Sequence, residues 1–435
     1  MSKQAVKSLP GFREFYPEDC AVRNYIFDRW RAVAHRYGFV EWEGPVLEPT
    51  DLYRLKSGDE ITQQLYCFED KGGRDVSLRP ELTPSLARMA VAKLREYKKP
   101  LRWFEIGPCF RYERQQKGRL REFYQFNCDL LGEPSEAADA ELIAFGIDIM
   151  RAFGFSEDHF AVRLSDRDVW KQFMQDGGIS VENENALLQI IDKLEREKPE
   201  AIDEKLEAIG SSLDAVRAFT ESKAETEAVS SVRRDLKARG FGEYVTVDLG
   251  IVRGLAYYTG VVFEIFDKLQ GMRAIAGGGR YDGLGKLIGG SDMAAVGFAM
   301  GDVVIGNLIN ETGSAKSKLS HYLAQVFSVD AYVIAATEDQ RPEALKLVQQ
   351  LRDGGLRVDY SLTPAKVGKQ FQAAEQRKAR VAIVVGDEFP EIGVKDLENR
   401  QEEPATPETV LDTARRILDK SPGSMLLANS NSNSN

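Results

Sequence analysis

The residues best suited to chemistry lie in a basic run from Arg111 to Arg121. Five of these eleven residues are basic and only Glu113 is acidic, in a chain whose net charge is −10. An arginine guanidinium can hold a phosphate or a carboxylate with two hydrogen bonds. Predicted strands over 101–112 and 122–131 flank a polar loop here. The run therefore suits an anionic ligand, although by charge alone a solvated basic hairpin is the commoner explanation.

Other residue types that carry catalysis are sparse. The three histidines, His35, His159 and His321, stand in no motif, so histidine-centred catalysis has few candidates. The four cysteines, Cys20, Cys67, Cys109 and Cys128, form no CxxC pair, so neither a zinc site nor a disulfide scaffold is predicted. An excess of 68 acidic over 58 basic residues disfavours nucleic-acid binding by the whole surface, but it leaves room for a local basic site.

Length and composition predict a globular protein of several domains. The 435 residues correspond to roughly three domains at ~150 residues each. With 43% hydrophobic and 29% charged residues, composition is ordinary for a globular chain. No apolar run reaches the ~18 residues of a membrane span, and MSKQAVKSLPGF lacks the apolar core of a signal peptide. We expect a reducing, cytoplasmic compartment.

The elements that position the basic run can be read from periodicity. Apolar residues at helical spacing predict a helix from Val22 to Tyr37, which Gly38 ends. A hairpin over 66–79 turns at Lys71-Gly72-Gly73, and helices are predicted over 82–97 and 137–153. Strands are expected over 244–249, 261–267 and 295–300, with a glycine-dense segment at 274–283 and a helix that begins near Gly301.

Three further regions differ in kind. Residues 165–240 are charged, poor in aromatics and helical in pattern, which predicts a solvated helical insertion without chemistry of its own. Residues 312–320 are small and polar, as in a linker. From 330, strands at 330–336, 356–362 and 379–386 alternate with helices at 342–353, 365–376 and 407–418, which predicts a parallel α/β domain. The tail, 429–435, is low-complexity and expected to be disordered.

The basic run and five other segments resemble the histidyl group of class II aminoacyl-tRNA synthetases. FRYERQQKGRLREF, at 110–123, resembles motif 2 of that class, and PGFREFYPED with the helix after it resembles motif 1, a dimer-forming element. LRPELTPSLAR resembles the histidyl amino-acid and ATP loop, and VRGLAYYTGVVFE a signature specific to the group. GGGRYDGL and AAVGFAMG resemble the glycine-rich strand and motif 3, and the region after 330 resembles the group's anticodon-binding domain.

The resemblance implies an activity and the residues that perform it. Histidine would be activated with ATP and transferred to tRNA-His, with Mg²⁺ accompanying ATP. Because negative charge gathers at phosphorus, preorganised cations should supply most of the catalysis. Arg111 and Arg253 are the implied catalytic residues on opposite sides of the α-phosphate, and Arg253 takes a role that relatives give to a metal. No metal site of the protein's own is predicted. The implied ATP-binding residues are Arg111, Glu113, Arg119, Arg253 and Gly301.

Selection of histidine needs a second constellation. The α-ammonium requires polar and acidic acceptors, and the imidazole requires a carboxylate on one nitrogen and an aromatic or hydroxyl partner on the other. The resemblance implies these histidine-binding residues: Glu81, Thr83, Gln125, Asp129, Tyr257, Tyr258 and Tyr281. Strand packing is an alternative for one of the adjacent tyrosines. For tRNA, the implied contacts are Gln116, Arg121, Lys366, Lys369 and Arg377, though a solvated helix face explains any single lysine as well.

Two departures from the family pattern keep alternatives open. Motif 3 usually ends in an arginine that touches the γ-phosphate, but residues 301–305 read GDVVI. The signature commonly reads RGLDYY, and here it reads RGLAYY. Arg79, Arg114 or Arg280 could supply the missing charge. The competing hypotheses are a catalytically inactive regulatory paralogue, such as the regulatory subunit of ATP phosphoribosyltransferase, and an RNA-binding regulator.

The expected architecture is an α+β catalytic core on an antiparallel sheet, with a helical insertion and a C-terminal α/β anticodon-binding domain. The catalytic domain would occupy 1–164 and 241–318, the insertion 165–240, the anticodon-binding domain 325–420 and the tail 421–435. Motif 1 implies a homodimer. The presence of the C-terminal domain favours the ligase over the regulatory paralogue.

Overall fold

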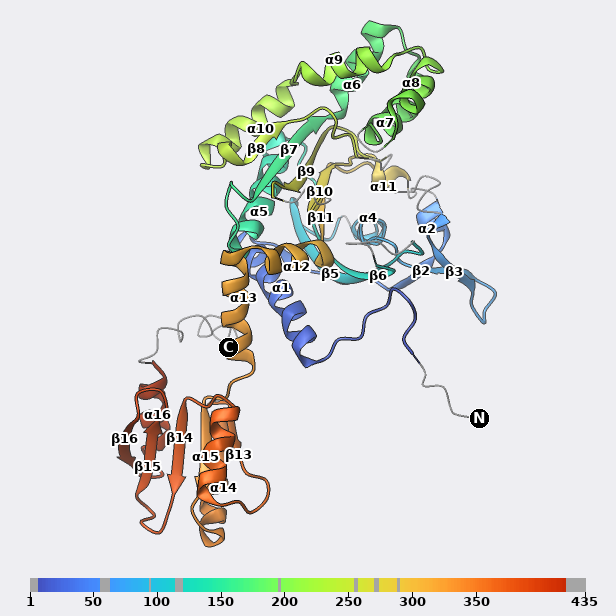
Figure 1. Ribbon diagram of the computed structural model, residues 1–435. Helices are drawn as coiled ribbons and strands as arrows, with labels where there is room; N and C mark the ends of the chain where they lie inside the picture. The colour runs from blue at the N-terminus through green and yellow to red at the C-terminus, as the bar shows by residue number, and fades with distance from the viewer. Residues whose placement is uncertain are drawn as a thin grey trace. The chain divides into compact units, whose positions relative to one another are not determined.

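The computed structural model describes residues 7–54, 63–93, 95–113, 120–194, 197–253, 257–269, 274–287 and 290–419. The chain divides into two compact units, Met1–Leu319 and Ser320–Asn435, each with its own main sheet (Figure 1). The expected tail over 421–435 lies outside the described residues. No helix in the described ranges is long and apolar enough to cross a membrane.

The first unit is built on an eight-stranded sheet, which confirms the antiparallel core that was predicted. The inner neighbours are antiparallel, and the two edge pairs, β1 with β5 and β7 with β8, are parallel. In spatial order the strands are β1 (Val40–Glu41), β5 (Leu101–Phe110), β6 (Glu122–Leu131), β11 (Ala295–Gly301), β10 (Ala276–Arg280), β9 (Val261–Asp267), β7 (Phe160–Asp166) and β8 (Val245–Val247). Strand β7 was missed in the sequence.

Long helices cover one face of this sheet. Helix α5 (Glu136–Phe153) packs on β6, β9, β10 and β11, and α1 (Pro17–Arg36) packs on α5 and on α12 (Asp302–Glu311). The core between them is aromatic: Trp30 is fully buried and stacks on Phe126, and Phe145 meets Phe298 edge to face. Helix α1 begins with a proline and acidic residues in its first turn, which suit a helix N-terminus.

A small sheet carries the loop that resembles the amino-acid and ATP loop. Its strands, in spatial order, are β2 (Leu47–Pro49), β4 (Asp75–Leu78) and β3 (Tyr66–Glu69), so the predicted hairpin is present. Helix α2 (Asp51–Arg54) follows β2. Helix α4 (Thr83–Ala92) is shorter than the predicted 82–97.

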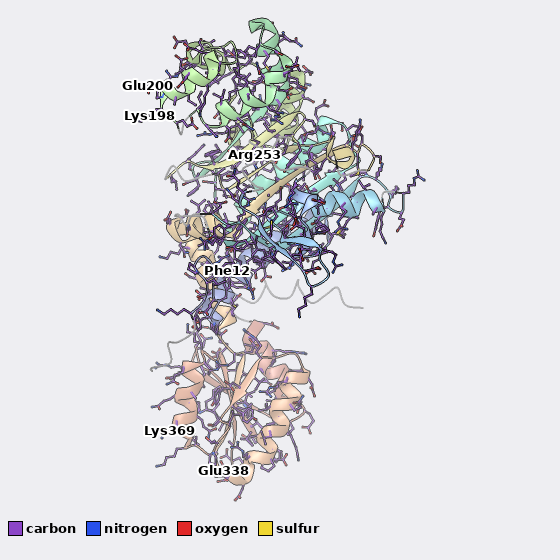
Figure 2. The ribbon with its side chains drawn as sticks, turned by 90° about the vertical axis from the view of Figure 1, so that its right-hand side faces the viewer. Phe12, Lys198, Glu200, Arg253, Glu338 and Lys369 are labelled. Carbon is purple, nitrogen blue, oxygen red and sulfur yellow. The ribbon has the colours of Figure 1, made fainter. Side chains whose placement is uncertain are left out.

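The insertion is helical, as predicted, and has a core of its own. It contains α6 (Arg167–Gly177), α7 (Glu184–Asp192), α8 (Pro199–Glu207), α9 (Leu213–Glu221) and α10 (Glu227–Ala238), with short 3₁₀ turns at Val181–Asn183 and Gly242–Tyr244. Trp170, Leu187 and Val216 are among the buried residues of this core. Helix α10 also packs against α5. Figure 2 shows Arg253 below the helices of the insertion, and Lys198 and Glu200 at the left edge of the insertion.

The predicted linker over 312–320 is wrong, because α13 (Gly313–Val326) is a continuous helix. Ala315 and Leu319 are buried on it, and their spacing of four places both on one helix face. Two buried apolar residues at helical spacing are therefore enough to fix this segment as a helix, although the residues around them are small and polar. The short α11 (Leu284–Leu287) lies earlier, between β10 and β11.

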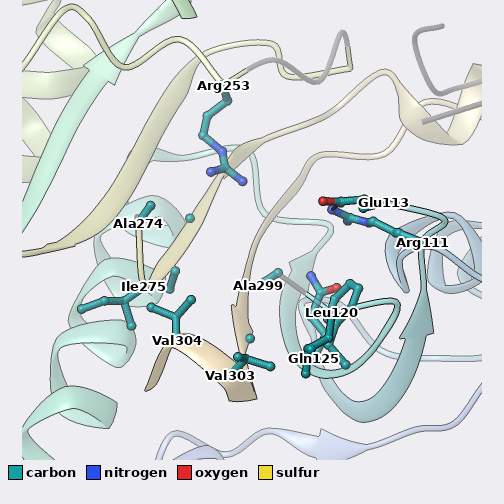
Figure 3. Close-up of a pocket in the computed structure, with 14 residues that line it drawn as sticks. Arg111, Glu113, Leu120, Gln125, Arg253, Ala274, Ile275, Ala299, Val303 and Val304 are labelled. Atoms are coloured by element: carbon teal, nitrogen blue, oxygen red, sulfur yellow. Dashed lines mark ion pairs between the residues drawn. The ribbon is translucent and has the colours of Figure 1, made fainter. Parts of the chain in front are cut away.

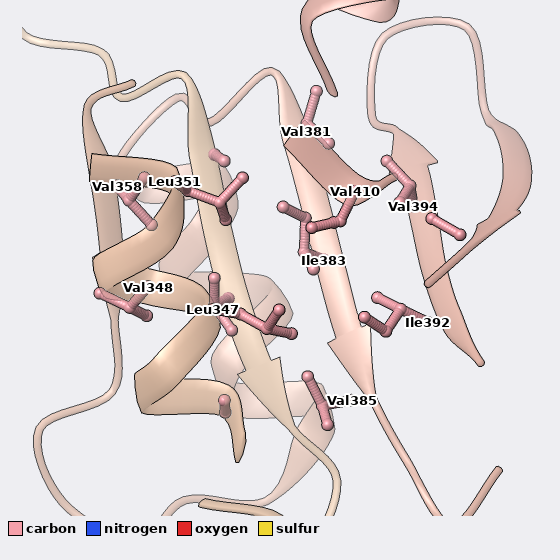
Figure 4. Close-up of a cluster of buried hydrophobic side chains, with 14 of the residues drawn as sticks. Leu347, Val348, Leu351, Val358, Val381, Ile383, Val385, Ile392, Val394 and Val410 are labelled. Atoms are coloured by element: carbon pink, nitrogen blue, oxygen red, sulfur yellow. The ribbon is translucent and has the colours of Figure 1, made fainter. Parts of the chain in front are cut away.

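The second unit is a five-stranded sheet with helices, but its sheet is not parallel throughout as predicted. Strands β13 (Val358–Tyr360), β12 (Ala331–Ala335) and β14 (Val381–Val385) are parallel, whereas β15 (Ile392–Asp396) and β16 (Gln401–Ala405) add an antiparallel edge. The helices are α14 (Arg341–Asp353), α15 (Val367–Gln376) and α16 (Val410–Asp419), and a 3₁₀ turn spans Glu338–Gln340. Figure 4 shows Leu347 and Leu351 of α14 packed toward the sheet in its aliphatic core.

Candidate active site

Strand β6 brings three polar side chains to one face of the first sheet. Gln125, Asn127 and Asp129 alternate along the strand, so they point to the same side. Their register partners on β11 are small: Gly301, Ala299 and Gly297. The next strand, β10, places Gly277 opposite Ala299. Small residues on two adjacent strands thus leave space above the sheet beside a polar wall.

The seven residues implied for histidine all line one cavity of about 70 Å³, here called the small cavity. Its walls come from four parts of the chain that lie far apart in sequence. The lining residues are Glu81, Thr83, Arg111, Gln125, Asn127, Asp129, Arg253, Tyr257, Tyr258, Gly277, Tyr281, Gly297, Phe298 and Ala299. Together these residues form a compact polar pocket with aromatic walls.

A carboxylate and a phenol meet at the inner end of the small cavity. Tyr281 Oη donates a hydrogen bond to Asp129 Oδ1 at 2.5 Å. Burial, followed by the neighbouring Asp129 carboxylate, raises the pKa of Tyr281 well above its ordinary value, so the phenol stays protonated and keeps donating. A Cβ on Gly297 would collide with the Asp129 carboxylate, so only glycine leaves room for that carboxylate.

The other walls of the small cavity hold one another in place. Asn127 Nδ2 donates to Thr83 Oγ1 at 3.1 Å, which joins β6 to the start of α4. Tyr257 lies 4.7 Å from Tyr258 and 5.9 Å from Tyr281 between ring centroids. Burial raises the pKa of Tyr257 well above its ordinary value. Glu81 is buried at the same wall.

A second cavity of about 330 Å³, here called the large cavity, adjoins the small one. The two share Arg111, Gln125, Arg253, Gly277 and Ala299 as lining residues. The large cavity adds Glu113, Phe123, Ile275, Gly301 and Val304, among others. Figure 3 shows Arg111 and Arg253 reaching toward it from opposite sides. Among the described residues that line it, these two are the only cations.

Arg111 is held at the end of β5 by three contacts. Its Nε donates to the Pro80 carbonyl at 3.0 Å, its Nη1 lies 3.9 Å from Glu113 Oε1, and its guanidinium lies 5.3 Å from the centre of the Phe123 ring. The side chain is 28% exposed, which leaves it accessible from the cavity. Its position is fixed, but its hydrogen-bonding capacity is not used up.

Arg253 approaches from the insertion side with a left-handed backbone, at φ 54°. Its Nη1 donates to Glu264 Oε1 at 2.5 Å, and its guanidinium lies 5.9 Å from the Tyr258 ring centre. Burial lowers the pKa of Arg253, but Tyr258 and Glu264 together raise it above its ordinary value, so the guanidinium stays protonated. A Cβ on Gly277 would collide with this guanidinium.

For Arg79 and Arg280, the prediction that they could replace the motif 3 arginine is wrong. Arg79 is 1% exposed and pairs with Glu105 at 2.7 Å, and Arg280 pairs with the buried Asp139. Both are thus consumed in structural ion pairs, because a buried cation requires a partner. The third, Arg114, lies outside the described residues. Val303 and Val304 of α12 line the cavity at the place where the sequence departs from the family.

The residues implied for ATP and tRNA are placed less completely. Gln116 and Arg119 lie outside the described residues. Arg121 lies 4.4 Å from the Tyr112 ring centre, and its Nε donates to the Glu113 carbonyl. In the second unit, Lys366 and Lys369 are exposed at the start of α15, and Arg377 at its end pairs with Asp359 at 2.8 Å.

Sequence reasoning missed several residues of the site. Asn127 could have been found, because it lies between Gln125 and Asp129 on the same strand face. Glu264 could not, because its contact with Arg253 depends on the register that places it opposite Gly277. Phe123 and Ile275 line the large cavity without any distinguishing sequence signal.

Two family models match most of the chain between them. The model of the histidyl-tRNA synthetase family matches residues 11–302, and the model of the anticodon binding domain matches residues 330–417. A histidine–tRNA ligase of Opitutus terrae is 42% identical over 421 residues, which cover 91% of this chain and 95% of the relative. One from Haloarcula marismortui is 36% identical, with 91% and 94% covered.

Solved structures show the same fold. The chain is similar to a crystal structure of histidyl-tRNA synthetase from Nostoc sp. PCC 7120, with a TM-score of 0.77, 24% identity, and 95% of this chain and 100% of that chain covered. An apo histidyl-tRNA synthetase of S. aureus gives a TM-score of 0.71 at 23% identity, with 94% and 100% covered.

An antiparallel sheet that carries two arginines above glycine-rich strands, followed by an α/β anticodon-binding domain, defines a class II aminoacyl-tRNA synthetase. The matched models and the full-length relatives go one step further. The chain belongs to the histidyl-tRNA synthetase family. Its activity is that of a histidine–tRNA ligase that uses ATP, as predicted, and the second matched domain favours this over the regulatory paralogue.

Proposed function

We propose that the small cavity binds histidine and the large cavity binds ATP, and that Arg111 and Arg253 bracket the phosphorus atom between them. The observation that carries this division is the shared wall: both arginines line both cavities. A carboxylate in the small cavity and an α-phosphate in the large one would meet beside the same two cations.

In the first step, a carboxylate oxygen of histidine attacks the α-phosphorus, and the bond from that phosphorus to the pyrophosphate oxygen breaks. Pyrophosphate leaves and histidyl-adenylate remains. In the second step, a ribose hydroxyl at the 3′ end of tRNA-His attacks the carbonyl carbon and AMP leaves. Arg111 and Arg253 stabilise the negative charge that develops in the first step, because fixed cations need no reorganisation.

Histidine is selected through hydrogen bonds that an analogue cannot replace. Asp129, oriented by Tyr281, accepts from one imidazole nitrogen, and Tyr258 meets the other side of the ring. Glu81, Thr83 and Gln125 receive the α-ammonium. A buried polar site of this kind rejects analogues lacking the imidazole by ~10⁴ or more, because its own groups would be left unpaired.

Three further residues are assigned to ATP besides Arg111 and Arg253. Glu113 and Gly301 line the large cavity, and Arg119 is assigned from the motif alone. Mg²⁺ would accompany ATP, held by the phosphates, with Glu113 as the carboxylate at hand in the large cavity.

For tRNA, we assign the acceptor end to Gln116 and Arg121 and the anticodon stem to Lys366, Lys369 and Arg377. The exposed lysines at the start of α15 support this, since backbone phosphates attract exposed surface cations. Arg377 must exchange Asp359 for a phosphate to contribute.

A homodimer and a cytoplasmic location complete the proposal. The dimer is supported by large apolar residues that remain exposed in and around the motif 1 region, such as Leu9, Tyr16 and Val40. Sedimentation should give about twice the chain mass of 48.7 kDa, and a monomer at micromolar concentration would contradict this. The location is expected from the sequence, although an Arabidopsis thaliana relative is named chloroplastic/mitochondrial.

The deciding experiment is amino-acid-dependent exchange of labelled pyrophosphate into ATP, run with each of the twenty amino acids. Exchange with histidine alone is expected, and would show that the reaction proceeds without a motif 3 arginine. Exchange with another amino acid, or no exchange by folded protein, would overturn the assignment of the two cavities.

A further inference from the structure

The chain around Arg253 and Tyr258 is anchored on the insertion. Leu249 and Val252 belong to the insertion's own buried core, together with Trp170 of α6. The indole Nε1 of Trp170 donates to the Leu249 carbonyl at 3.1 Å. The segment that delivers Arg253 to the two cavities therefore starts from an attachment to the insertion, not to the sheet alone.

Arg167, the first residue of α6, makes the second attachment. It is 5% exposed, and its Nη1 donates to the Tyr258 carbonyl at 2.6 Å. Its backbone N–H donates to the Gly260 carbonyl at 3.1 Å. One residue of the insertion thus fixes two of three consecutive residues that begin at a wall of the small cavity.

From Tyr258 the contacts continue to the imidazole-binding end of the small cavity. Tyr258 packs on Tyr257, Tyr257 on Tyr281, and Tyr281 donates to Asp129. A shift of the Tyr258 backbone would displace these rings in turn. None of the three tyrosines lines the large cavity, so that cavity would feel the shift only through Arg253, whose guanidinium lies 5.9 Å from the Tyr258 ring centre and is also held by Glu264.

Burial of the Arg167 guanidinium costs free energy, which nearby acceptors and carboxylates must offset. Burial lowers the pKa of Arg167, and the Glu184 carboxylate at the start of α7 opposes that effect. An apolar side chain here would leave the Tyr258 carbonyl buried without this charged donor, which costs more than loss of an ordinary hydrogen bond. The Arg167 side chain therefore ties α6 to the cavity wall.

We propose that Arg167 is a positioning residue for the histidine site, through which the helical insertion forms part of the amino-acid pocket. This goes beyond the sequence expectation that the insertion has no chemistry of its own. It rests on the proposed function, in which Tyr258 binds histidine.

The test compares R167M and R167K with a matched control, R163M, in histidine-dependent pyrophosphate exchange. Arg163 lies on the strand that leads into α6, but its guanidinium pairs with Asp248 and lies over Phe266. R167M should raise the KM for histidine about 10-fold or more, with the KM for ATP changed less than about twofold. R167K should recover part of the loss, and R163M should resemble the unaltered protein.

Two results would overturn the proposal. One is an unchanged KM for histidine in R167K and in folded R167M. The other is an equal rise in both KM values accompanied by a lower melting temperature, which would indicate general damage. If R167M does not fold, R167K carries the test alone. Failure of the proposed function is separable, because it would appear as a normal KM for histidine in Y258F or as no histidine-dependent exchange by the unaltered chain.

Discussion

At the scale of single residues, the candidate site depends on a few side chains whose positions are fixed by their neighbours. Arg253 combines a left-handed backbone, an ion pair with Glu264 and a place in the walls of both cavities. Asp129 combines a short hydrogen bond from Tyr281 with a space that only Gly297 leaves. Each is fixed by neighbours from another part of the chain.

Replacing Arg253 with alanine should nearly abolish adenylate formation and preserve the fold. The loss of a fixed transition-state cation should lower the rate of pyrophosphate exchange about 10³-fold. Alanine and arginine bear similar strain at φ 54°, so circular dichroism and the melting temperature should change little. Exchange at the normal rate in this variant would remove Arg253 from the mechanism.

Replacing Gly297 with alanine should weaken histidine binding. The added methyl group would press on the Asp129 carboxylate, and overpacking of this kind costs about 1–3 kcal/mol, so the KM for histidine should rise about tenfold. The matched control is G306A in α12, where an added methyl group would meet only Ile26 at 3.7 Å. A G297A variant with the same KM as G306A would contradict the packing argument.

Much of the site could be predicted at this scale, and the errors have a common cause. The seven residues that the motifs assign to histidine line one cavity, and their binding roles stay predictions. Arg79 and Arg280 were misjudged because their buried partners, Glu105 and Asp139, lie 26 and 141 residues away in the chain. Sequence alone cannot tell a cation that faces a cavity from one that is neutralised across the fold.

At the scale of elements, periodicity predicted the long helices and central strands and failed where tertiary contacts decide. Helix α1 and strands β5 and β6 have strong patterns and were found. Helix α13 was missed because only two buried residues define its inner face. Strands β15 and β16 were missed because their hydrophobic pattern is weak. Strand β16 is a mostly exposed edge strand that contains a proline, and β15 has a glycine and a lysine between its buried residues.

The N-terminal segment is held to α12 by an ion pair whose acid, Asp302, is buried and whose base, Arg13, is partly exposed. Asp302, the first residue of α12, accepts from the Tyr124 N–H at 2.9 Å and pairs with Arg13 at 2.8 Å. D302N should lower the free energy of unfolding by about 2 kcal/mol, measured by urea denaturation. The control D51N alters the first residue of α2, an exposed acid, and should change it by less than about 0.5 kcal/mol. Equal effects would show that Asp302 is not a tether.

At the scale of the whole molecule, the two units have separate cores. The aliphatic core around Leu347, Ile383 and Val394 lies wholly within the second unit. The fold class of both units and the division of labour between them were accessible from the sequence, since each carries its own motifs. Their exact limits were not, because α13 crosses the division between them.

Destabilising the second unit should therefore separate the two half-reactions. I383A should cost that unit about 2–5 kcal/mol, because it removes most of a fully buried side chain. On warming, tRNA charging should fail at a lower temperature than pyrophosphate exchange. L345A, which alters a partly exposed leucine of α14, is the control. Simultaneous loss of both activities in I383A would mean that the units unfold together.

The wall shared by the two cavities restricts how this enzyme could evolve. In the proposed assignment of the cavities, a substitution at Arg111, Gln125, Arg253, Gly277 or Ala299 would alter the surroundings of both substrates at once, so natural selection could not adjust one affinity there without disturbing the other. Residues that face only the small cavity, such as Asp129 and Tyr281, carry no such double duty. Any lineage that drifted toward another amino acid would have to change those positions first.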